Sequence, residues 1–204
     1  MLTNYDIRPF HRVAVLASVD VVSTVTMDDL RRATPCNGWS VSQLLAHMTV
    51  QHRGFAAAAR GDGADPARWD AATVADAVAA DPAGTYAAAA ADVLAAFTDD
   101  AVLDTSFALP EFGPAAVFPG SQAIGFHFVD YVVHAWDVAR ALDVGLDLPE
   151  DVVRAALPVA EAVPDGPGRL EPGAAFAPRL PEPPGATPMD RILALLGRSP
   201  TWPA

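Results

Sequence analysis

Three ionisable side chains, those of His127, Asp130 and His134, lie within the apolar run HFVDYVVHAWDVARALD at residues 127–143. A helix advances 100° per residue, so His134 falls about 20° from His127, and Asp130 falls about 60° from it on the same side. Asp130 and His134 are four residues apart, a spacing that lets two side chains converge on one point. Tyr131 flanks this stripe on its other side, within about 40°. The spacing therefore predicts a line of polar groups along one face of an otherwise apolar helix.

A further histidine, His47, lies in the segment SQLLAHMTVQHRG at residues 42–54. On a helix, Gln43 and Gln51 lie about 40° to either side of His47. His52 lies about 140° away and is expected to point elsewhere. This segment therefore offers one histidine, flanked by two amides, to a neighbouring helix.

Burying an unpaired carboxylate or imidazole is costly, and a bound metal ion would offset that cost. Two histidines and one carboxylate from two helices of a bundle form a facial set of ligands that leaves coordination positions open. Open positions admit water or substrate, which suits Lewis-acid or thiolate chemistry. The alternative is structural: the Asp130–His134 pair would be a local hydrogen bond, and His47 would be a histidine of the core or its rim.

The chain has one cysteine, Cys36, so no intrachain disulfide can form, which suits a reducing cytoplasm. No basic residue lies near Cys36 in the sequence to lower its pKa, and we therefore favour packing over a reactive thiol. Trp39 is expected to anchor the start of the helix that carries His47. His11 is expected at the surface.

Long helical segments are expected to position these groups, because apolar residues recur at three-to-four spacing while strand patterns are scarce. Ser40 with Gln43 has the form of a capping box, and Thr187, Pro188 and Gly197 mark the start and the end of a final short helix. The expected helices cover residues 6–22, 41–60, 73–80, 84–98, 122–142, a segment opening at 149–150 with Pro158 inside it, and 188–196.

Two segments lack helical periodicity. Residues 101–120 are expected to be a loop with at most one extended piece. Residues 164–188 hold eight prolines and are expected to form a surface strap rather than a second domain. We therefore expect an all-α fold: a four-helix bundle with a long crossover over residues 1–163, and over residues 164–204 a proline-rich strap with a short helix packed on the same domain.

Composition limits the partners. Hydrophobic residues make up 51% of the 204 residues, enough for a sizeable core. The formal net charge of -12 argues against nucleic acid and anionic membrane surfaces, because both require a basic face. The first residues lack the apolar run of a signal peptide, and the alanine-rich stretches are interrupted before they reach membrane-spanning length. A cytoplasmic protein is expected.

Three motifs in this order, TPCNGWSVSQLLAHM, HFVDYVVHAWDVARALD and DRILALLGRSPTW, resemble the DinB-like metal-binding proteins of mycothiol-producing bacteria. Those proteins are related to the N-terminal domain of mycothiol-dependent maleylpyruvate isomerase. The resemblance covers nearly the whole chain, and it implies a DinB-like four-helix bundle with one divalent metal. That metal is usually zinc, with Ni²⁺ or Fe²⁺ as alternatives.

The resemblance also implies the ligands: His47 from the LLxH helix, and Asp130 and His134 from the acid-x-x-x-His pair. The isomerase-type pattern has glutamate at the acidic position, so Asp130 departs from it by one methylene. His127 is expected to surround the ligands rather than to be a fourth one.

Other residues are expected to surround the ligands or to line the pocket. Asp137 either orients a ligating imidazole or forms a salt bridge, for example to Arg140. Trp136 is expected to pack. The expected surrounding residues are His127, Asp137, Gln43, Gln51 and Tyr131.

The resemblance implies a metal-dependent enzyme of a low-molecular-weight thiol such as mycothiol or its conjugate, in S-transferase or isomerase chemistry. Maleylpyruvate isomerase itself is disfavoured, because that enzyme carries a separate C-terminal domain and only a short, proline-rich segment follows the last bundle helix here. A non-catalytic module that binds a metal or a partner, and a metal-dependent hydrolase, stay open. A homodimer also stays open.

Overall fold

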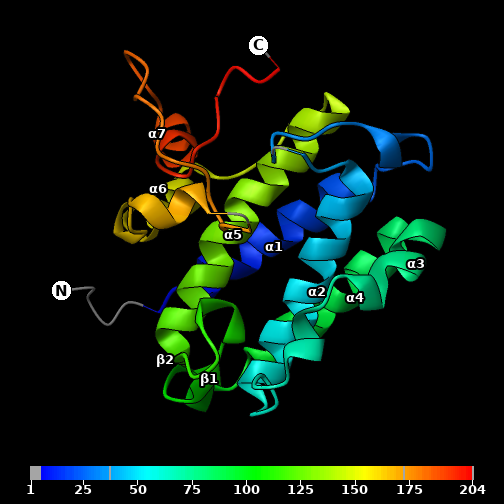
Figure 1. The fold of residues 1–204 in the computed structure, drawn as a ribbon, viewed down its shortest axis with the longest axis vertical. Helices are drawn as coiled ribbons and strands as arrows, with labels where there is room; N and C mark the ends of the chain where they lie inside the picture. Colours follow the sequence, from blue (N-terminus) through cyan, green and yellow to red (C-terminus); the bar gives the residue numbers. More distant parts are fainter. Residues whose placement is uncertain (1–5, 37, 172, 204) are drawn as a thin grey trace.

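Helices carry most of the protein in the computed structural model, which describes residues 6–36, 38–171 and 173–203 (Figure 1). The α-helices of these residues are α1 (Arg8–Val22), α2 (Val41–Ala59), α3 (Ala72–Ala80), α4 (Pro82–Ala96), α5 (Gly120–Leu142), α6 (Glu150–Ala162) and α7 (Pro188–Leu195). Short 3-10 turns lie between them: η1 (Asp29–Arg31), η2 (Pro66–Trp69), η3 (Asp100–Leu103), η4 (Pro110–Phe112) and η5 (Pro167–Leu170).

Four helices form the bundle. α1 packs against α5, α5 against α2, α2 against α4, and α4 against α1, so the contacts close a ring. In this ring α1 is diagonal to α2, and α4 is diagonal to α5. Both long connections, residues 23–40 and 97–119, therefore cross the bundle, which agrees with the expected four-helix arrangement and its long crossover.

The helix starts follow the capping signals of the sequence. The Ser40 side chain accepts from the Gln43 backbone N–H, while the Gln43 side chain accepts from the Ser40 backbone N–H, which completes the capping box of α2. Thr187 and Asp190 form a second capping box at α7. Gly197 follows α7 with a φ of 76°, a left-handed conformation that glycine adopts without a steric penalty.

The connection from α4 to α5 is more ordered than expected. It contains two short strands, β1 (Ser106–Ala108) and β2 (Val117–Pro119), which pair antiparallel with Phe107 opposite Phe118. The expectation of a loop with at most one extended piece was therefore wrong, because two extended segments pair in a small sheet. Strands of three residues have too few positions for an alternating pattern to stand out from a proline-rich sequence.

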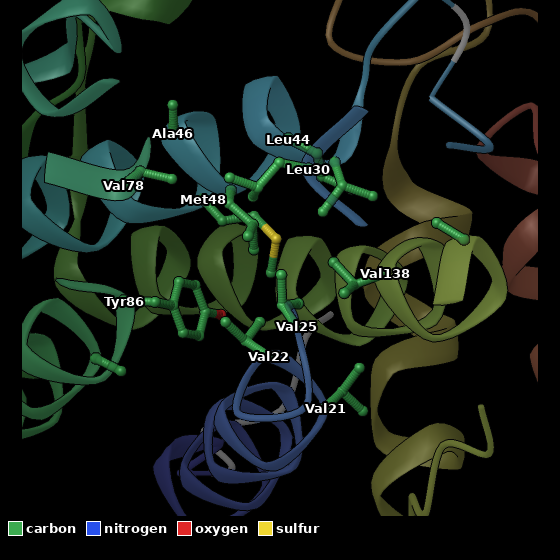
Figure 2. Packing of buried hydrophobic residues seen from close by; sticks show 14 of the residues in the cluster. Val21, Val22, Val25, Leu30, Leu44, Ala46, Met48, Val78, Tyr86 and Val138 are labelled. Carbon is green, nitrogen blue, oxygen red and sulfur yellow. The ribbon is translucent and has the colours of Figure 1, made fainter. Parts of the chain in front are cut away.

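The core between the bundle helices is apolar. Met48 of α2 is fully buried and lies among Val22, Val25 and Val138 (Figure 2). A second cluster joins α5 to α6 and α7 and contains Val129, Val153 and Ile192. The C-terminal helix α7 thus packs on α6, which in turn packs on α5, the helix that carries Asp130 and His134. No helix of the described residues is long and apolar enough to cross a membrane.

Candidate metal centre

The side chains of His47, Asp130 and His134 come together between α2 and α5, which pack against each other in the bundle. One possible ligand atom from each residue lies within 4.8 Å of the other two. His134 Nε2 is 3.3 Å from Asp130 Oδ1, and the rings of His47 and His134 are 5.3 Å apart between centroids. The Asp130 side chain is 23% exposed and that of His134 is 5% exposed, so the trio lies at an edge of the interior that solvent can reach.

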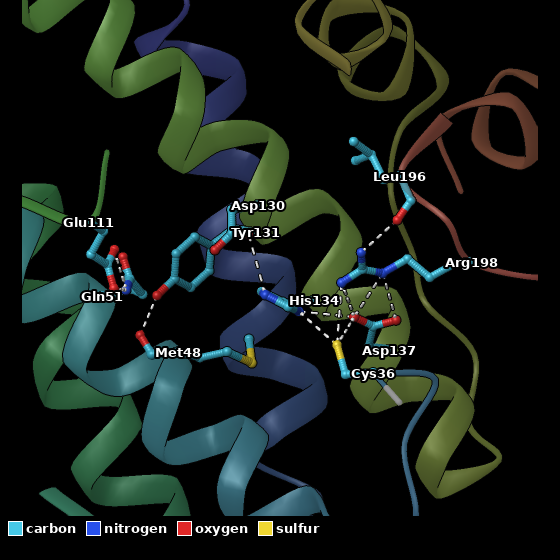
Figure 3. Close-up of polar contacts among 10 residues, drawn as sticks. All are labelled: Cys36, Met48, Gln51, Glu111, Asp130, Tyr131, His134, Asp137, Leu196 and Arg198. Carbon is cyan, nitrogen blue, oxygen red and sulfur yellow. Dashed lines mark hydrogen bonds and ion pairs between the residues drawn. The ribbon is translucent and has the colours of Figure 1, made fainter. Parts of the chain in front are cut away.

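His134 is held by Asp137 on the side away from Asp130 (Figure 3). Its Nδ1 is 2.9 Å from Asp137 Oδ2, so a proton on Nδ1 is donated to that carboxylate and Nε2 faces Asp130. Asp137 thus fits both expectations, because it contacts the imidazole and also forms a salt bridge, to Arg198 rather than to Arg140. The alternative salt bridge to Arg140 is not formed, because Arg140 donates to the Trp202 carbonyl oxygen instead.

The charge on Asp137 is balanced by Arg198, which follows α7. Arg198 Nη2 is 3.1 Å from Asp137 Oδ2, and both side chains are buried. Burial by itself raises the pKa of Asp137, but the Arg198 charge outweighs it, and the pKa falls to about 2. Asp137 is therefore ionised at neutral pH. Arg198 was not among the expected site residues, because it lies 61 residues from Asp137 in the chain.

The two histidines of the trio titrate differently. Burial, with help from the charge of His134, lowers the pKa of His47 to about 4, so His47 is neutral at pH 7 with an available lone pair. Burial also acts to lower the pKa of His134, but the charge of Asp130 and the hydrogen bonds to Asp130 and Asp137 outweigh it. The pKa of His134 is raised well above its ordinary value, so without a metal this imidazole carries a proton that pairs it with Asp130.

Cys36, His134 and Asp137 form a second group with converging ligand atoms. The Cys36 thiol donates to Asp137 Oδ2 at 3.1 Å, and Arg198 Nη2 is 3.2 Å from its sulfur. The guanidinium charge of Arg198 already lies at this group, and it would repel a metal cation there. Cys36 packs against the core as expected, but it also has a basic neighbour that its local sequence did not indicate.

The trio of His47, Asp130 and His134 fits a divalent metal by the chemistry of its donors. Two imidazole nitrogens and one carboxylate oxygen are common ligands of zinc, and they also suit nickel and iron. A ligating histidine usually donates its other ring N–H to a carboxylate, which is the arrangement of His134 and Asp137.

The other residues expected around the ligands, Gln43, Gln51 and Tyr131, form hydrogen bonds with residues outside the trio. Gln43 is exposed and engaged in the cap of α2. Gln51 is buried and donates to Glu111 of η4. Tyr131 is buried and donates to the Met48 carbonyl oxygen. Of these three, only Gln51 leads to a polar group that the sequence did not indicate.

His127 belongs to a separate chain of buried histidines. Its Nδ1 is 2.8 Å from His11 Nε2, and its Nε2 is 3.2 Å from His52 Nδ1. Both ring nitrogens are thus engaged away from the trio. His52 points away from His47, as expected. The expectation that His11 lies at the surface was wrong: its side chain is 1% exposed, because the first turn of α1 packs against α5.

The two tryptophans closest in sequence to the candidate ligands have different surroundings. Trp136 is 9% exposed and packs in the cluster of α5, α6 and α7, as expected. Trp39 precedes α2 and is 37% exposed, and its ring lies 4.9 Å from that of His47. It therefore forms an apolar rim beside the first candidate ligand.

The family model of the mycothiol maleylpyruvate isomerase N-terminal domain matches residues 12–139, more than half of the chain. The chain belongs to this family. The matched range includes His47, Asp130, His134 and Asp137, but it ends before Arg198. The resemblance read from the three sequence motifs is thereby confirmed.

Two curated relatives are uncharacterised proteins from two strains of Mycobacterium tuberculosis. Each is 29% identical over 189 residues, which cover 93% of this chain and 96% of the relative. The similarity to these relatives, which are of similar length, therefore extends over nearly the whole chain.

Two solved structures of mycothiol-dependent maleylpyruvate isomerase, one of them a mutant, have the same fold. The TM-scores are 0.56 and 0.57 at 17% and 15% sequence identity, and each match covers 88% of this chain and 76% of the isomerase chain. At this identity the likeness shows the fold alone: a DinB-like, mainly helical bundle.

Proposed function

We propose that His47, Asp130 and His134 bind one divalent metal ion, zinc in the first place with Ni²⁺ or Fe²⁺ as alternatives, and that the protein acts on a thiol of the mycothiol type or its conjugate. The observation that carries the proposal is the convergence of three ligand atoms within 4.8 Å, with Asp137 holding the far side of His134. Packing alone would not require three ionisable groups to meet at one point.

When bound, the metal would supply Lewis acidity that favours the thiolate form of a thiol at neutral pH. The residues of the chain would perform the remaining tasks. Asp137 holds His134 in one ring orientation, and Arg198 stabilises the ionised form of Asp137. Asp130 and Trp39 are both partly exposed, so a small molecule would approach the trio from their side.

The family supports the choice of thiol, since its solved members include a mycothiol-dependent isomerase. Transfer or isomerisation through the thiol sulfur is therefore the proposed class of reaction, and the S-transferase is preferred to maleylpyruvate isomerase itself. An intracellular thiol as partner, together with the free cysteine, fits the cytoplasm.

The test is a thiol-conjugation assay with mycothiol and an electrophile, using protein stripped of metal and then reloaded with Zn²⁺. We expect a saturable rate that is lost on stripping, restored on reloading and absent from His47→Ala. Asp147→Asn, an exposed change away from the trio, serves as the control and should keep the rate. Mycothiol binding without a metal-dependent rate would instead support a non-catalytic binding module.

A further inference from the structure

A second polar feature lies one helical turn from the candidate ligands on both helices. Gln51 follows His47 by four residues on α2, and Phe126 precedes Asp130 by four residues on α5. Both side chains are met by η4, whose Glu111 and Phe112 contact Gln51 and Phe126 respectively. We call the four residues Gln51, Glu111, Phe112 and Phe126 the Glu111 patch.

The polar half of the Glu111 patch carries a negative charge. Gln51 Nε2 is 2.8 Å from both carboxylate oxygens of Glu111. Burial raises the pKa of Glu111, although the hydrogen bond from Gln51 acts against this rise and suits an ionised carboxylate, which accepts at both oxygens. Glu111 and Gln51 are drawn beside Tyr131, on the side away from His134 and Asp137 (Figure 3).

The apolar half of the Glu111 patch is an aromatic surface. Phe112 stacks on Phe126 with ring centroids 5.1 Å apart, and Phe118 of β2 meets both rings edge-on. Phe112 is nevertheless 57% exposed. The Glu111 patch thus offers an exposed aromatic ring and a carboxylate beside residues that lie one helical turn from the candidate ligands.

Arg198, the buried cation paired with Asp137, does not balance this charge. Arg198 is buried beside Asp137, about three turns of α5 away from the position of Phe126, and its guanidinium is engaged by Asp137 and the Leu196 carbonyl oxygen. The accessible side of the trio thus presents two carboxylates, Asp130 and Glu111. A metal ion would offset the charge of Asp130 and leave that of Glu111.

We infer that Glu111 is a specificity-determining residue, which makes the site select uncharged or cationic partners carrying an aromatic or apolar group and reject anionic ones such as dicarboxylates. This inference rests on the proposed function, because it assigns the substrate class of the same metal-dependent site. Glu111 would act by charge, and Phe112 and Phe126 would supply the apolar contact.

The test uses Co²⁺-loaded protein and three small thiols of similar size: cysteamine, which is cationic, 2-mercaptoethanol, which is neutral, and 3-mercaptopropionate, which is anionic. Thiolate binding to cobalt gives a charge-transfer absorption, so affinity is read without catalysis. Wild type should bind the cationic and the neutral thiol more tightly than the anionic one. In Glu111→Gln the anionic thiol should gain about threefold to tenfold relative to the neutral one, as expected for removing one like charge at partial exposure.

Two further variants complete the test. Glu171→Gln, an exposed change in the C-terminal strap, should leave the order of the thiols unchanged. Glu111→Lys should reverse it, so that the anionic thiol binds best. If wild type, Glu111→Gln and Glu111→Lys showed the same relative affinities for the three thiols, the inference would be overturned. A cobalt–thiolate band in the same experiment would still support the proposed function. Absence of the band with all three thiols would overturn the proposed function and the inference with it.

Discussion

At the scale of single residues, the candidate centre depends on the orientation of one imidazole. His134 directs Nε2 toward Asp130 because Nδ1 is held by Asp137, and Asp137 in turn is held by Arg198. Asp137 and Arg198 are both buried, so neither is readily replaced by water. The arrangement makes the metal affinity of the trio sensitive to residues that touch no metal.

Replacing Asp137 by asparagine should weaken metal binding. The amide cannot balance Arg198 and is a poorer acceptor for the His134 N–H, so we expect a loss of about 10-fold to 100-fold in Zn²⁺ affinity. Competition with a chromogenic chelator measures this affinity. Asp147→Asn is the matched control, and an equal affinity for both variants would contradict the role of Asp137.

Metal binding should also release a proton near pH 7. Without metal, His134 is protonated because its neighbouring carboxylates raise its pKa, whereas His47 is already neutral because burial lowers its pKa to about 4. A ligating imidazole must be neutral, so binding displaces the proton of His134, and affinity should fall as the pH falls. Calorimetry in buffers of different ionisation enthalpy counts the protons. A count of zero at pH 7 would contradict the charged His134.

At the scale of elements, three helices meet at the buried histidine chain. His11 of α1, His127 of α5 and His52 of α2 are each at most 1% exposed. Burial lowers the pKa of His11 to about 3, and burial followed by the charges of the neighbouring histidines lowers those of His127 and His52 well below the ordinary value. All three are therefore neutral in the folded protein at pH 7.

The three buried histidines, His11, His52 and His127, should make the folded protein less stable at acid pH. Below the ordinary histidine pKa of about 6.5 the unfolded protein binds protons that the folded protein does not, so the free energy of unfolding falls as the pH drops from about 6.5 toward 3. Each histidine contributes up to about 1.4 kcal/mol per pH unit. His11→Leu should therefore reduce the slope by about that amount, as measured by urea unfolding at several pH values.

The control for this slope is Val15→Ala on the same helix. Val15 is fully buried, so its truncation should lower stability at every pH without changing the slope. If His11→Leu keeps the wild-type slope, His11 does not titrate as its burial requires.

The positions of most helices could be predicted from the sequence, because local patterns such as caps and apolar spacing determine them. The capping box of Ser40 and Gln43 and the apolar spacing of residues 122–142 are examples, and α5 begins only two residues earlier, at Gly120. Helical spacing also puts Asp130 and His134 on one face, whereas His47 was named as their partner from the family resemblance. Only the packing of α2 on α5 brings His47 to them.

Contacts between distant segments could not be predicted. Glu111 lies 60 residues from Gln51, and Arg198 lies 61 residues from Asp137. No local pattern specifies which segments the two crossing connections bring together. His11 was misplaced for the same reason, since its burial depends on the packing of α1 against α5 and α4 rather than on the sequence around it.

At the scale of the whole molecule, the C-terminal segment is tied to the bundle by polar and apolar contacts. Arg198 reaches Asp137 and Cys36, while Ile192 and Leu193 pack with α5 and α6. We therefore propose that residues 164–204 form part of the same folding unit as residues 1–163. Arg198 is the residue that joins this segment to the candidate centre.

Replacing Arg198 by glutamine should destabilise the whole fold. It leaves Asp137 buried without its counter-charge, at a cost of about 3–5 kcal/mol in the free energy of unfolding. Unfolding followed by far-UV circular dichroism and by tryptophan fluorescence should remain one coincident transition at a lower urea midpoint. Arg31→Gln, an exposed change, is the control. Two separate transitions in the wild type would contradict a single folding unit.

The central claim is that a divalent metal is bound by His47, Asp130 and His134 and not by the group that contains Cys36. The most direct measurement is the metal content of protein purified without added metal, compared among wild type, His47→Ala and Cys36→Ser. The account predicts about one divalent ion per chain in wild type and in Cys36→Ser, and a large loss in His47→Ala. Equal metal content in wild type and His47→Ala, or loss of the metal from Cys36→Ser alone, would contradict it.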